Sequence, residues 1–332
     1  MKTIFTLNGY FNYGNRLQLF ALGKILKKSD DNILTYCPKT LLQRIRMFLK
    51  YNTFLKYVFK KEMKLKKFTK KYTPKTSNNV TGYIVVGSDQ VWNPDYFENA
   101  PYLLTGIDIA TKISYAASIG REQLSSAELD DFRNALRNYK AISVRERSAK
   151  ELLQPLTDKK IEVVLDPTLL LDKIEYERLE KRPRDIAEGE RYILCYILGD
   201  SDYQLTIEKF AKENNCRVIS FSDKKGSNYG VEEFLYLIHH AELVCTDSFH
   251  ACVFSFIFNK PFVAFRRTGE ANYMYSRLQN FIDTFKLKNR EYNGSGITKK
   301  NLSCDYTEGR KILKKEQEKS LKFLEEALGE YK

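Results

Sequence analysis

Short apolar runs alternate along this chain with segments that repeat hydrophobic residues at helical spacing. The apolar runs predict strands at residues 3–7, 83–87, 112–118, 141–146, 161–165, 191–198, 217–222, 243–246 and 261–265. The helical spacing predicts helices near 15–28, 202–214, 231–242, 248–258 and 307–331. Continuous apolar strands separated by helices are typical of a parallel sheet that is buried on both faces.

A charged stretch at residues 172–191 interrupts this alternation, which then restarts. We therefore expect an α/β protein of two doubly wound, Rossmann-like domains, and 332 residues are enough for both. The predicted domains are residues 1–170 and 171–306, followed by a helix in 307–332 that can pack back on the first domain. Because ligands bind at the carboxyl ends of parallel strands, we expect the site in a cleft where the two domains face one another.

Four polar residues interrupt the stretch "VCTDSFHACVFSFIFNKPFVAF" at the point where a strand gives way to a helix. Asp247 or Ser248 can cap the helix by accepting a bond from a backbone N–H, and His250 can be an ordinary core residue. Alternatively, the helix N-terminus attracts an anion and His250 exchanges a proton near pH 7. The second interpretation predicts a site for an anion and a proton at this strand end.

Polar residues also follow other predicted strands. Asp89 and Gln90 come after the strand at 83–87 and are candidate hydroxyl binders, with a turn and a helix cap as the alternative. Arg145 lies at the end of the strand at 141–146, where a salt bridge to a nearby glutamate is the alternative.

Further candidates surround the first and the last predicted strands. In "NYGNRLQ", Gly14 permits a tight turn and Asn15 can cap a helix. This segment is neither a GxGxxG motif nor a P-loop, so dinucleotide or ATP binding is not indicated. Lys260 precedes the last strand, and Arg266 and Arg267 follow it.

Composition restricts the class of protein. Hydrophobic residues make up 43% of the chain, which indicates a globular protein. The N-terminus lacks a signal-peptide pattern and no apolar run approaches the roughly 20 residues that span a bilayer, so we expect a cytoplasmic protein. The six cysteines contain no CxxC pair, and we expect neither disulfides nor a metal site. His239 and His240, on a helix flank, are expected to pack or to be solvated.

The positive charge is concentrated in one segment. Residues 39–75 hold thirteen Lys or Arg and one acid, which accounts for +12 of the net charge of +13. Aromatic and aliphatic residues alternate with the lysines, which predicts a basic, amphipathic helical insertion in the first domain. A solvated helix is one interpretation, and docking on an anionic membrane surface is another. No nucleic-acid-binding motif is present, so we expect no nucleic acid partner.

Several motifs, taken together, resemble one family. "YFNYGNRLQLFAL", "GSDQVWNP", "KISYAASIG", "ISVRE", "VLDPTLLL" and "TDSFHACVFSFIFNKPFVAFRR" occur in this order. They resemble the polysaccharide pyruvyl transferase family over roughly residues 5–290. The resemblance implies a fold similar to the two-domain GT-B glycosyltransferases. Where the family usually has glycine after the histidine, this chain has Ala251, which adds a methyl group beside His250.

The resemblance also implies a reaction. Members of the family transfer a pyruvyl group from phosphoenolpyruvate to sugar hydroxyls, forming a cyclic ketal in cell-surface polysaccharides, and no cofactor is implied. His250 is then the proton donor or base, Asp247 orients it or accepts the hydroxyl proton, and the helix that starts at Ser248 faces the phosphate. The anion clamps would be Arg145, Lys260 and Arg266, with Arg267 as an equally spaced alternative to Arg266.

The acceptor implied by the family is a sugar, often a lipid-linked precursor at the inner face of the membrane, which would suit a peripheral location. Two other functions stay open. A glycosyltransferase of the same fold would bind a nucleotide sugar with the residues of the second domain. A non-catalytic protein that binds glycans or membranes would retain the fold without the reaction.

Overall fold

The computed structural model describes residues 1–7, 12–27, 32–36, 55–77, 80, 82–96, 101–105, 110–199, 203–221, 229–267 and 275–329. The chain divides into two compact units. Unit 1 comprises Met1–Leu55, Thr69–Leu171 and Lys314–Lys332, and unit 2 comprises Lys56–Phe68 and Asp172–Leu313. The cleft expected between two domains stays a prediction.

Unit 1 is built on a seven-stranded sheet with the order β3-β2-β1-β4-β5-β6-β7, in which all neighbouring strands are parallel. The strands are β1 (Lys2–Phe5), β2 (Ile33–Tyr36), β3 (Lys75–Ser77), β4 (Gly82–Val86), β5 (Ala110–Ala117), β6 (Tyr139–Val144) and β7 (Ile161–Val163). The helices are α1 (Tyr13–Leu26), α4 (Ser126–Leu136), α5 (Arg147–Leu153) and the part of α11 (Thr307–Leu328) from residue 314 onward. Short 3₁₀ helices lie at Pro94–Tyr96, Pro101–Leu103, Gln154–Leu156 and Pro167–Leu169.

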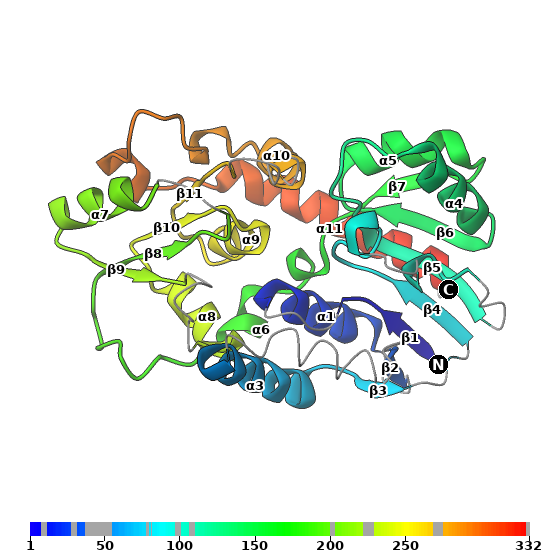
Figure 1. Cartoon of the computed structure of the whole chain (residues 1–332), viewed down its shortest axis with the longest axis horizontal. Helices are drawn as coiled ribbons and strands as arrows, with labels where there is room; N and C mark the ends of the chain where they lie inside the picture. Colours follow the sequence, from blue (N-terminus) through cyan, green and yellow to red (C-terminus); the bar gives the residue numbers. More distant parts are fainter. Residues whose placement is uncertain are drawn as a thin grey trace. The chain divides into compact units, whose positions relative to one another are not determined.

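Helices cover both faces of this sheet (Figure 1). One apolar cluster joins β-strand residues such as Phe5 and Val86 to Phe132 of α4 and Leu153 of α5. The cluster on the other face joins alternate strand residues to α1 and to the end of α11, through residues that include Ile4, Val85, Leu22, Leu324 and Leu328. Side chains alternate between the two faces of a strand, so a continuous run of apolar residues contributes to the clusters on both faces of the sheet.

Unit 2 contains a four-stranded parallel sheet with the order β11-β10-β8-β9. Its strands are β8 (Tyr192–Tyr196), β9 (Arg217–Ser220), β10 (Leu243–Thr246) and β11 (Phe262–Ala264). Its helices are α6 (Lys173–Glu177), α7 (Tyr203–Glu213), α8 (Val231–His239), α9 (Phe249–Ile257) and α10 (Tyr275–Thr284), and 3₁₀ turns lie at Lys288–Arg290 and Lys299–Leu302.

The two faces of the second sheet are packed differently. Aliphatic residues and the α7 side chains Ile207 and Phe210 form one cluster against the strands. Aromatic rings fill the other face, where Tyr196 contacts Phe234 of α8 edge-on and Phe234 in turn contacts Phe254 of α9. The α/β class and the two doubly wound sheets predicted from the sequence are therefore confirmed.

The segments at the domain boundaries differ in detail from the prediction. The division falls at 171/172, and the last helix contributes residues to both units. Within unit 1, Ser320 of α11 accepts a hydrogen bond from the backbone N–H of Leu165 at 3.0 Å. Strands β2 and β3 and helices α4, α5, α6 and α10 were not predicted. The two strands are short and lie at one edge of the sheet, where little of the strand needs to be apolar.

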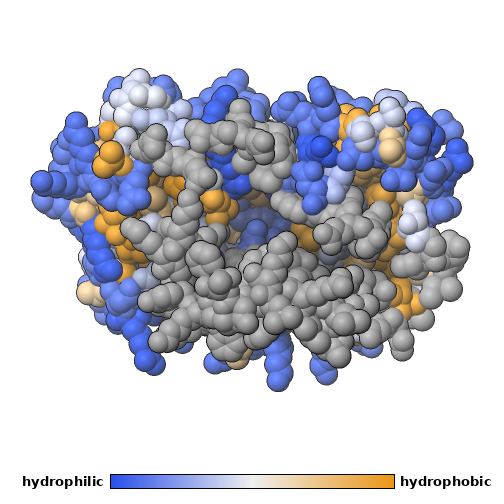
Figure 2. Space-filling view, in the orientation of Figure 1, coloured by the Kyte–Doolittle hydropathy of each residue, from blue (hydrophilic) through white to orange (hydrophobic). Residues whose placement is uncertain are grey.

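Most side chains on the visible surface of the described chain are hydrophilic (Figure 2).

The cysteines behave as small core residues at three positions, since Cys195, Cys245 and Cys252 are buried, whereas Cys216 is partly exposed. Burial raises the pKa of the Cys195 thiol to about 11, so this thiol stays protonated and unreactive at neutral pH.

Candidate functional site

The carboxyl edge of the unit 2 sheet contains a topological switch point. The chain passes from β8 to β9 on one side, and then returns to place β10 and β11 on the other side of β8. The loops after β8 and β10 therefore diverge at this edge, which is where parallel sheets bind their ligands. The polar residues of the 246–250 stretch follow β10 directly and so lie at this point.

Asp247 holds the loop that follows β8. Its Oδ1 accepts a hydrogen bond from the backbone N–H of Leu198, and its Oδ2 accepts one from Gly199, both at 2.8 Å. Arg267 donates to Oδ2 through Nε at 2.9 Å. The Asp247 side chain is 2% exposed, so all three bonds form in a desolvated environment, where bonds to a charged group contribute about 1.5–3 kcal/mol each.

This arrangement differs from the role expected for Asp247. The sequence suggested that it orients His250 or accepts a proton from a hydroxyl. Instead, both carboxylate oxygens bind backbone N–H groups of the neighbouring loop, and one of them also binds a guanidinium. We therefore regard Asp247 as a positioning residue for the loop and for Arg267.

Gly199 makes the close approach of these groups possible. A Cβ atom at this position would lie 3.0 Å from Cγ of Arg267 and 3.3 Å from Oδ2 of Asp247. A larger residue would require the Arg267 and Asp247 side chains to shift by a few tenths of an ångström. Gly199 was not among the residues predicted from the sequence, although a glycine shortly after a buried parallel strand is a usable signal.

Ser248 and His250 begin the helix that follows. Ser248 occupies the N-cap position of α9, and its side chain makes no capping hydrogen bond, so neither Ser248 nor Asp247 caps this helix as the alternative interpretation expected. The Thr246 hydroxyl instead accepts a bond from the Ser248 N–H at 3.0 Å and donates to the Tyr196 carbonyl at 2.6 Å. These bonds fix the turn from which α9 starts.

His250 lies in the first turn of α9 and is 6% exposed. Its ring meets the ring of Phe249 edge-on, with centroids 5.2 Å apart. The imidazole is therefore held in a largely desolvated position at the positive end of a helix. In such a position an imidazole can exchange a proton with a substrate whose anionic group binds beside it.

The structure distinguishes between the two arginines after β11. The Arg267 side chain is 16% exposed and pairs with Asp247 at the switch point. The Arg266 side chain is 62% exposed, lies over the ring of Tyr275 and pairs with Glu291 at 3.6 Å. Of the two, Arg267 is the one that belongs to the same cluster as Asp247.

Lys260 lies at the other edge of the sheet. It precedes β11, and the backbone N–H of Val244, at the start of β10, donates to the carbonyl of Pro261. Burial lowers the pKa of the Lys260 ammonium. Because β10 separates the two edges by four residues, or roughly 13 Å, the structure does not bring Lys260 to the cluster at the switch point.

Unit 1 has its own polar cluster at the carboxyl edge of its sheet. Arg145 follows β6 and pairs with Asp166 at 2.8 Å, with Asp89 at 3.6 Å and with Glu146 at 3.9 Å. Burial alone would lower the pKa of the Arg145 guanidinium, and the neighbouring carboxylates, led by Asp166, raise it. One guanidinium among three carboxylates favours the ion-pair interpretation of Arg145 over an anion clamp.

Asp89 and Gln90 are part of this buried edge. Asp89 is 4% exposed, has φ +72°, and its Oδ1 accepts a bond from the N–H of Gln90. Gln90 packs against Gly120, where a Cβ atom would lie 2.1 Å from the Gln90 amide nitrogen. Both residues are therefore tightly enclosed within unit 1.

Several residues of this edge carry hydrogen bonds that the sequence analysis did not anticipate. Glu146 Oε1 accepts bonds from the Ser118 hydroxyl and from the N–H groups of Ile119 and Gly120. Ser88 donates to Asp166 Oδ2 at 3.1 Å. Ser88 and Asp166 come immediately after predicted strands, and Ser118 and Glu146 are the last residues of predicted strands; a polar residue at a strand end is the signal that could have identified them.

The start of α1 corrects two expectations. The N-cap is Asn12, whose side chain accepts bonds from the N–H groups of Gly14 and Asn15 at 2.8 and 3.3 Å. Asn15 therefore lies inside the helix and does not cap it. Gly14 also lies in the first helical turn, so it does not form the expected tight turn.

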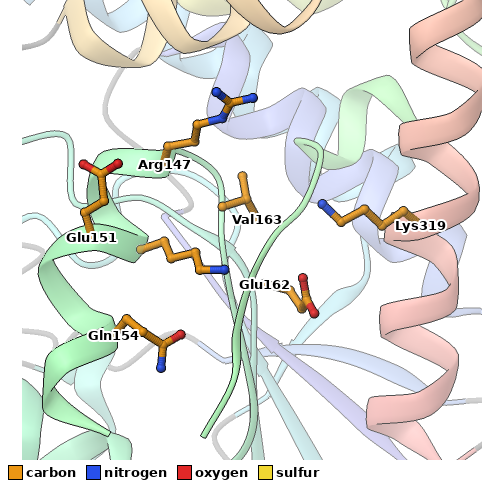
Figure 3. Close-up of a pocket in the computed structure, with 7 residues that line it drawn as sticks. Arg147, Glu151, Gln154, Glu162, Val163 and Lys319 are labelled. Carbon is orange, nitrogen blue, oxygen red and sulfur yellow. The ribbon is translucent and has the colours of Figure 1, made fainter. Parts of the chain in front are cut away.

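A cavity of about 470 Å³ lies elsewhere in unit 1 (Figure 3). Its walls come from α5, the edge strand β7 and α11, and are lined by Arg147, Lys150, Glu151, Gln154, Glu162, Val163 and Lys319. Its lining contains both basic and acidic side chains, and none of the predicted site residues lines it.

The basic segment is described only in part, since residues 39–54 lie outside the described ranges. Helix α3 (Leu55–Tyr72) follows them, and its residues 56–68 belong to unit 2. Leu65 and Phe68 are buried, and Lys64 pairs with Glu233 at 2.9 Å. Leu65 and Phe68 are thus buried in the protein, whereas Met63 is exposed. Within the described part of the segment the exposed lysines are Lys66, Lys67, Lys70, Lys71 and Lys75. None of the helices in the described ranges is both long and apolar enough to cross a bilayer.

Several solved structures are distantly similar to this chain. UDP-GlcNAc 2-epimerase from Neisseria meningitidis bound to UDP-GlcNAc is 12% identical, with a TM-score of 0.48 and full coverage of both chains. HepE from Anabaena in complex with UDP is 11% identical, with a TM-score of 0.47 and full coverage of both chains. UDP-GlcNAc 2-epimerase from Methanocaldococcus jannaschii is 15% identical, with a TM-score of 0.46, over 94% of this chain and 98% of that one.

No curated protein sequence matches this chain. The sequence profile of the polysaccharide pyruvyl transferases matches residues 12–269, a range that includes the whole switch-point cluster from Gly199 to Arg267. The match extends over most of the described strands of both units. The chain therefore belongs to the polysaccharide pyruvyl transferase family.

Proposed function

We propose that this protein transfers a pyruvyl group from phosphoenolpyruvate to two hydroxyls of a sugar, in a cell-surface polysaccharide or its lipid-linked precursor. The products are a cyclic ketal and inorganic phosphate. One observation carries the proposal: His250, in the first turn of α9, and Arg267, held by Asp247, both lie at the switch-point edge of unit 2. The family match supports the reaction class.

The donor explains why these residue types are needed together. Phosphoenolpyruvate has a phosphate and a carboxylate, and both require positive charge or N–H donors. The start of α9 offers backbone N–H groups and the positive end of the helix dipole. Arg267 donates to Asp247 through Nε and, to the backbone carbonyl, through Nη2. A guanidinium has five N–H donors in a planar fork, which is the geometry that binds carboxylate and phosphate groups.

The reaction requires proton transfer at carbon and at oxygen. A proton added to the methylene carbon of phosphoenolpyruvate makes C2 electrophilic, and the first sugar hydroxyl adds to C2 and loses its proton. The second hydroxyl then replaces phosphate at C2, so the C2–O bond to phosphate breaks as the ketal closes. One hydroxyl proton balances the proton given to carbon, and the other leaves with phosphate. We assign the proton donor and base to His250.

The decisive experiment compares the wild-type chain with His250→Gln on a panel of lipid-linked and nucleotide-linked sugars. Mass spectrometry should show the pyruvyl addition, and the released phosphate should equal the product formed. We expect His250→Gln to fold with an unchanged melting temperature and to lose turnover about a hundredfold or more.

Two results would contradict the proposal. One is full turnover in a folded His250→Gln protein, which would make the histidine structural. The other is glycosyl transfer from a nucleotide sugar with no phosphate release from phosphoenolpyruvate, which would indicate a glycosyltransferase.

A further inference from the structure

Two histidines and a glutamate converge at the amino-terminal edge of the unit 2 sheet. His239 ends α8 and His240 follows it, while Glu180 lies just beyond α6. Nδ1 of His239 is 2.7 Å from Oε1 of Glu180, and Nε2 of His240 is 3.2 Å from Oε2. The ligand atoms of the three residues all lie within 4.8 Å of one another.

Both imidazole rings are fixed by stacking. His239 lies nearly parallel to the ring of Phe258, with centroids 4.5 Å apart and an interplanar angle of 16°. His240 stacks on Tyr236 at 4.1 Å and 23°. The rings therefore hold their orientation toward Glu180, so little side-chain entropy remains to be lost when a ligand binds.

The donor set suits zinc. Imidazole nitrogen and carboxylate oxygen are the usual non-thiolate ligands of Zn²⁺, with bonds of about 2.0–2.2 Å. A second carboxylate, that of Glu177, lies 3.8 Å from Nε2 of His239, the ring nitrogen on the far side from Glu180. A carboxylate facing the distal nitrogen of a metal-bound histidine is a recurrent feature of zinc sites, because it fixes the tautomer and the ring orientation.

Distances and charge permit an ion between these groups. Two atoms bound to the same tetrahedral zinc lie about 3.4 Å apart, given bonds of about 2.1 Å. The separations of 2.7 and 3.2 Å involve the two different oxygens of Glu180 and need to widen by less than about 1 Å. The three ligand atoms lie within 4.8 Å of one another, so no separation needs to shorten by more than about 1.4 Å. Lys260 acts on His240 as a positive charge and opposes binding, whereas Glu177 and Glu180 favour it.

We propose that Glu180, His239 and His240 bind one divalent transition-metal ion of the zinc class, with Glu177 orienting His239. The ion connects the end of α8 to the segment after α6, close to Asp172, where the longer stretch of unit 2 begins. His240 precedes β10 and His250 follows it, so this site lies at the opposite edge of the sheet from the switch point. Its role is structural, and it does not depend on the proposed reaction.

The test uses the untagged full chain, stripped of metal with a chelator and then titrated with Zn²⁺ alone. Calorimetry should show one ion per chain with micromolar or tighter affinity, and the melting temperature should rise with zinc concentration. Glu180→Gln and His240→Gln should each weaken binding at least tenfold. Two controls should leave it unchanged: Glu242→Gln, since Glu242 pairs with Arg191 instead, and Cys216→Ser combined with Cys304→Ser.

A second measurement does not depend on how well the variants fold. Co²⁺ bound to the wild-type chain should show a d–d absorption spectrum without a thiolate charge-transfer band. The proposal is overturned if the wild-type chain binds no Zn²⁺ at micromolar concentration, if binding survives both ligand substitutions, or if the cobalt spectrum shows thiolate ligation.

Discussion

Replacing Asp247 by asparagine tests whether this residue positions a loop or acts on the substrate. The asparagine side chain would keep the shape of the aspartate and one acceptor oxygen, but it would turn the second oxygen into an N–H donor. In the wild-type chain the two oxygens accept bonds from Leu198, Gly199 and Arg267. In Asp247→Asn the new amide N–H group therefore faces at least one of these N–H donors, in a nearly fully buried position.

The size of the effect follows from these bonds. Each lost hydrogen bond to a charged acceptor costs about 1.5–3 kcal/mol, and breaking a buried ion pair costs about 3–5 kcal/mol. Arg267 is partly exposed, so water screens some of this loss and we expect the free energy of unfolding to fall by about 3 kcal/mol. With a slope of about 1–3 kcal/mol per molar urea, the unfolding midpoint should fall by roughly 1–3 M.

The assay combines urea unfolding, followed by circular dichroism, with hydrogen exchange of the backbone. At least one of the amides of Leu198 and Gly199 should exchange faster in Asp247→Asn, because one of the two acceptor oxygens becomes an N–H donor. Glu242→Gln, which breaks the exposed pair with Arg191, is the matched control and should leave the midpoint unchanged. An unchanged midpoint and unchanged exchange, together with a collapse of turnover, would refute the positioning role and make Asp247 a catalytic residue.

Two further predictions concern binding. Arg267→Lys should raise the KM for phosphoenolpyruvate about tenfold or more in steady-state kinetics, because lysine cannot reproduce the planar guanidinium. Arg266→Lys should leave this KM nearly unchanged, and a larger effect of Arg266→Lys than of Arg267→Lys would contradict the assignment. The chain should bind anionic but not neutral vesicles in a sedimentation assay, more weakly as salt rises, and glutamine at Lys66, Lys67, Lys70 and Lys71 should abolish this binding. A wild-type chain that ignores anionic vesicles at low salt would exclude docking.

The sequence alone was enough to identify the architecture. Strands of a parallel sheet buried on both faces are predominantly apolar, so the runs around β1, β4, β5, β6, β8 and β10 are visible without any structure. The motifs from "GSDQVWNP" to "TDSFHACVF" likewise indicated the family, which the profile match confirms. The sequence also located His250 in the first turn of a helix that follows a strand.

Only the tertiary structure decided which polar side chains meet. Arg266 and Arg267 are equivalent by spacing. In the folded chain their side chains point in different directions after β11, so Arg267 pairs with Asp247 and Arg266 pairs with Glu291. Lys260 is ten residues from His250 in the chain, but the strand direction places it at the other edge of the sheet. Periodicity encodes the burial of each residue, whereas partners distant in sequence are fixed by strand order and register. For the same reason Glu180 and His239, 59 residues apart, could be recognised as neighbours only after the chain had folded.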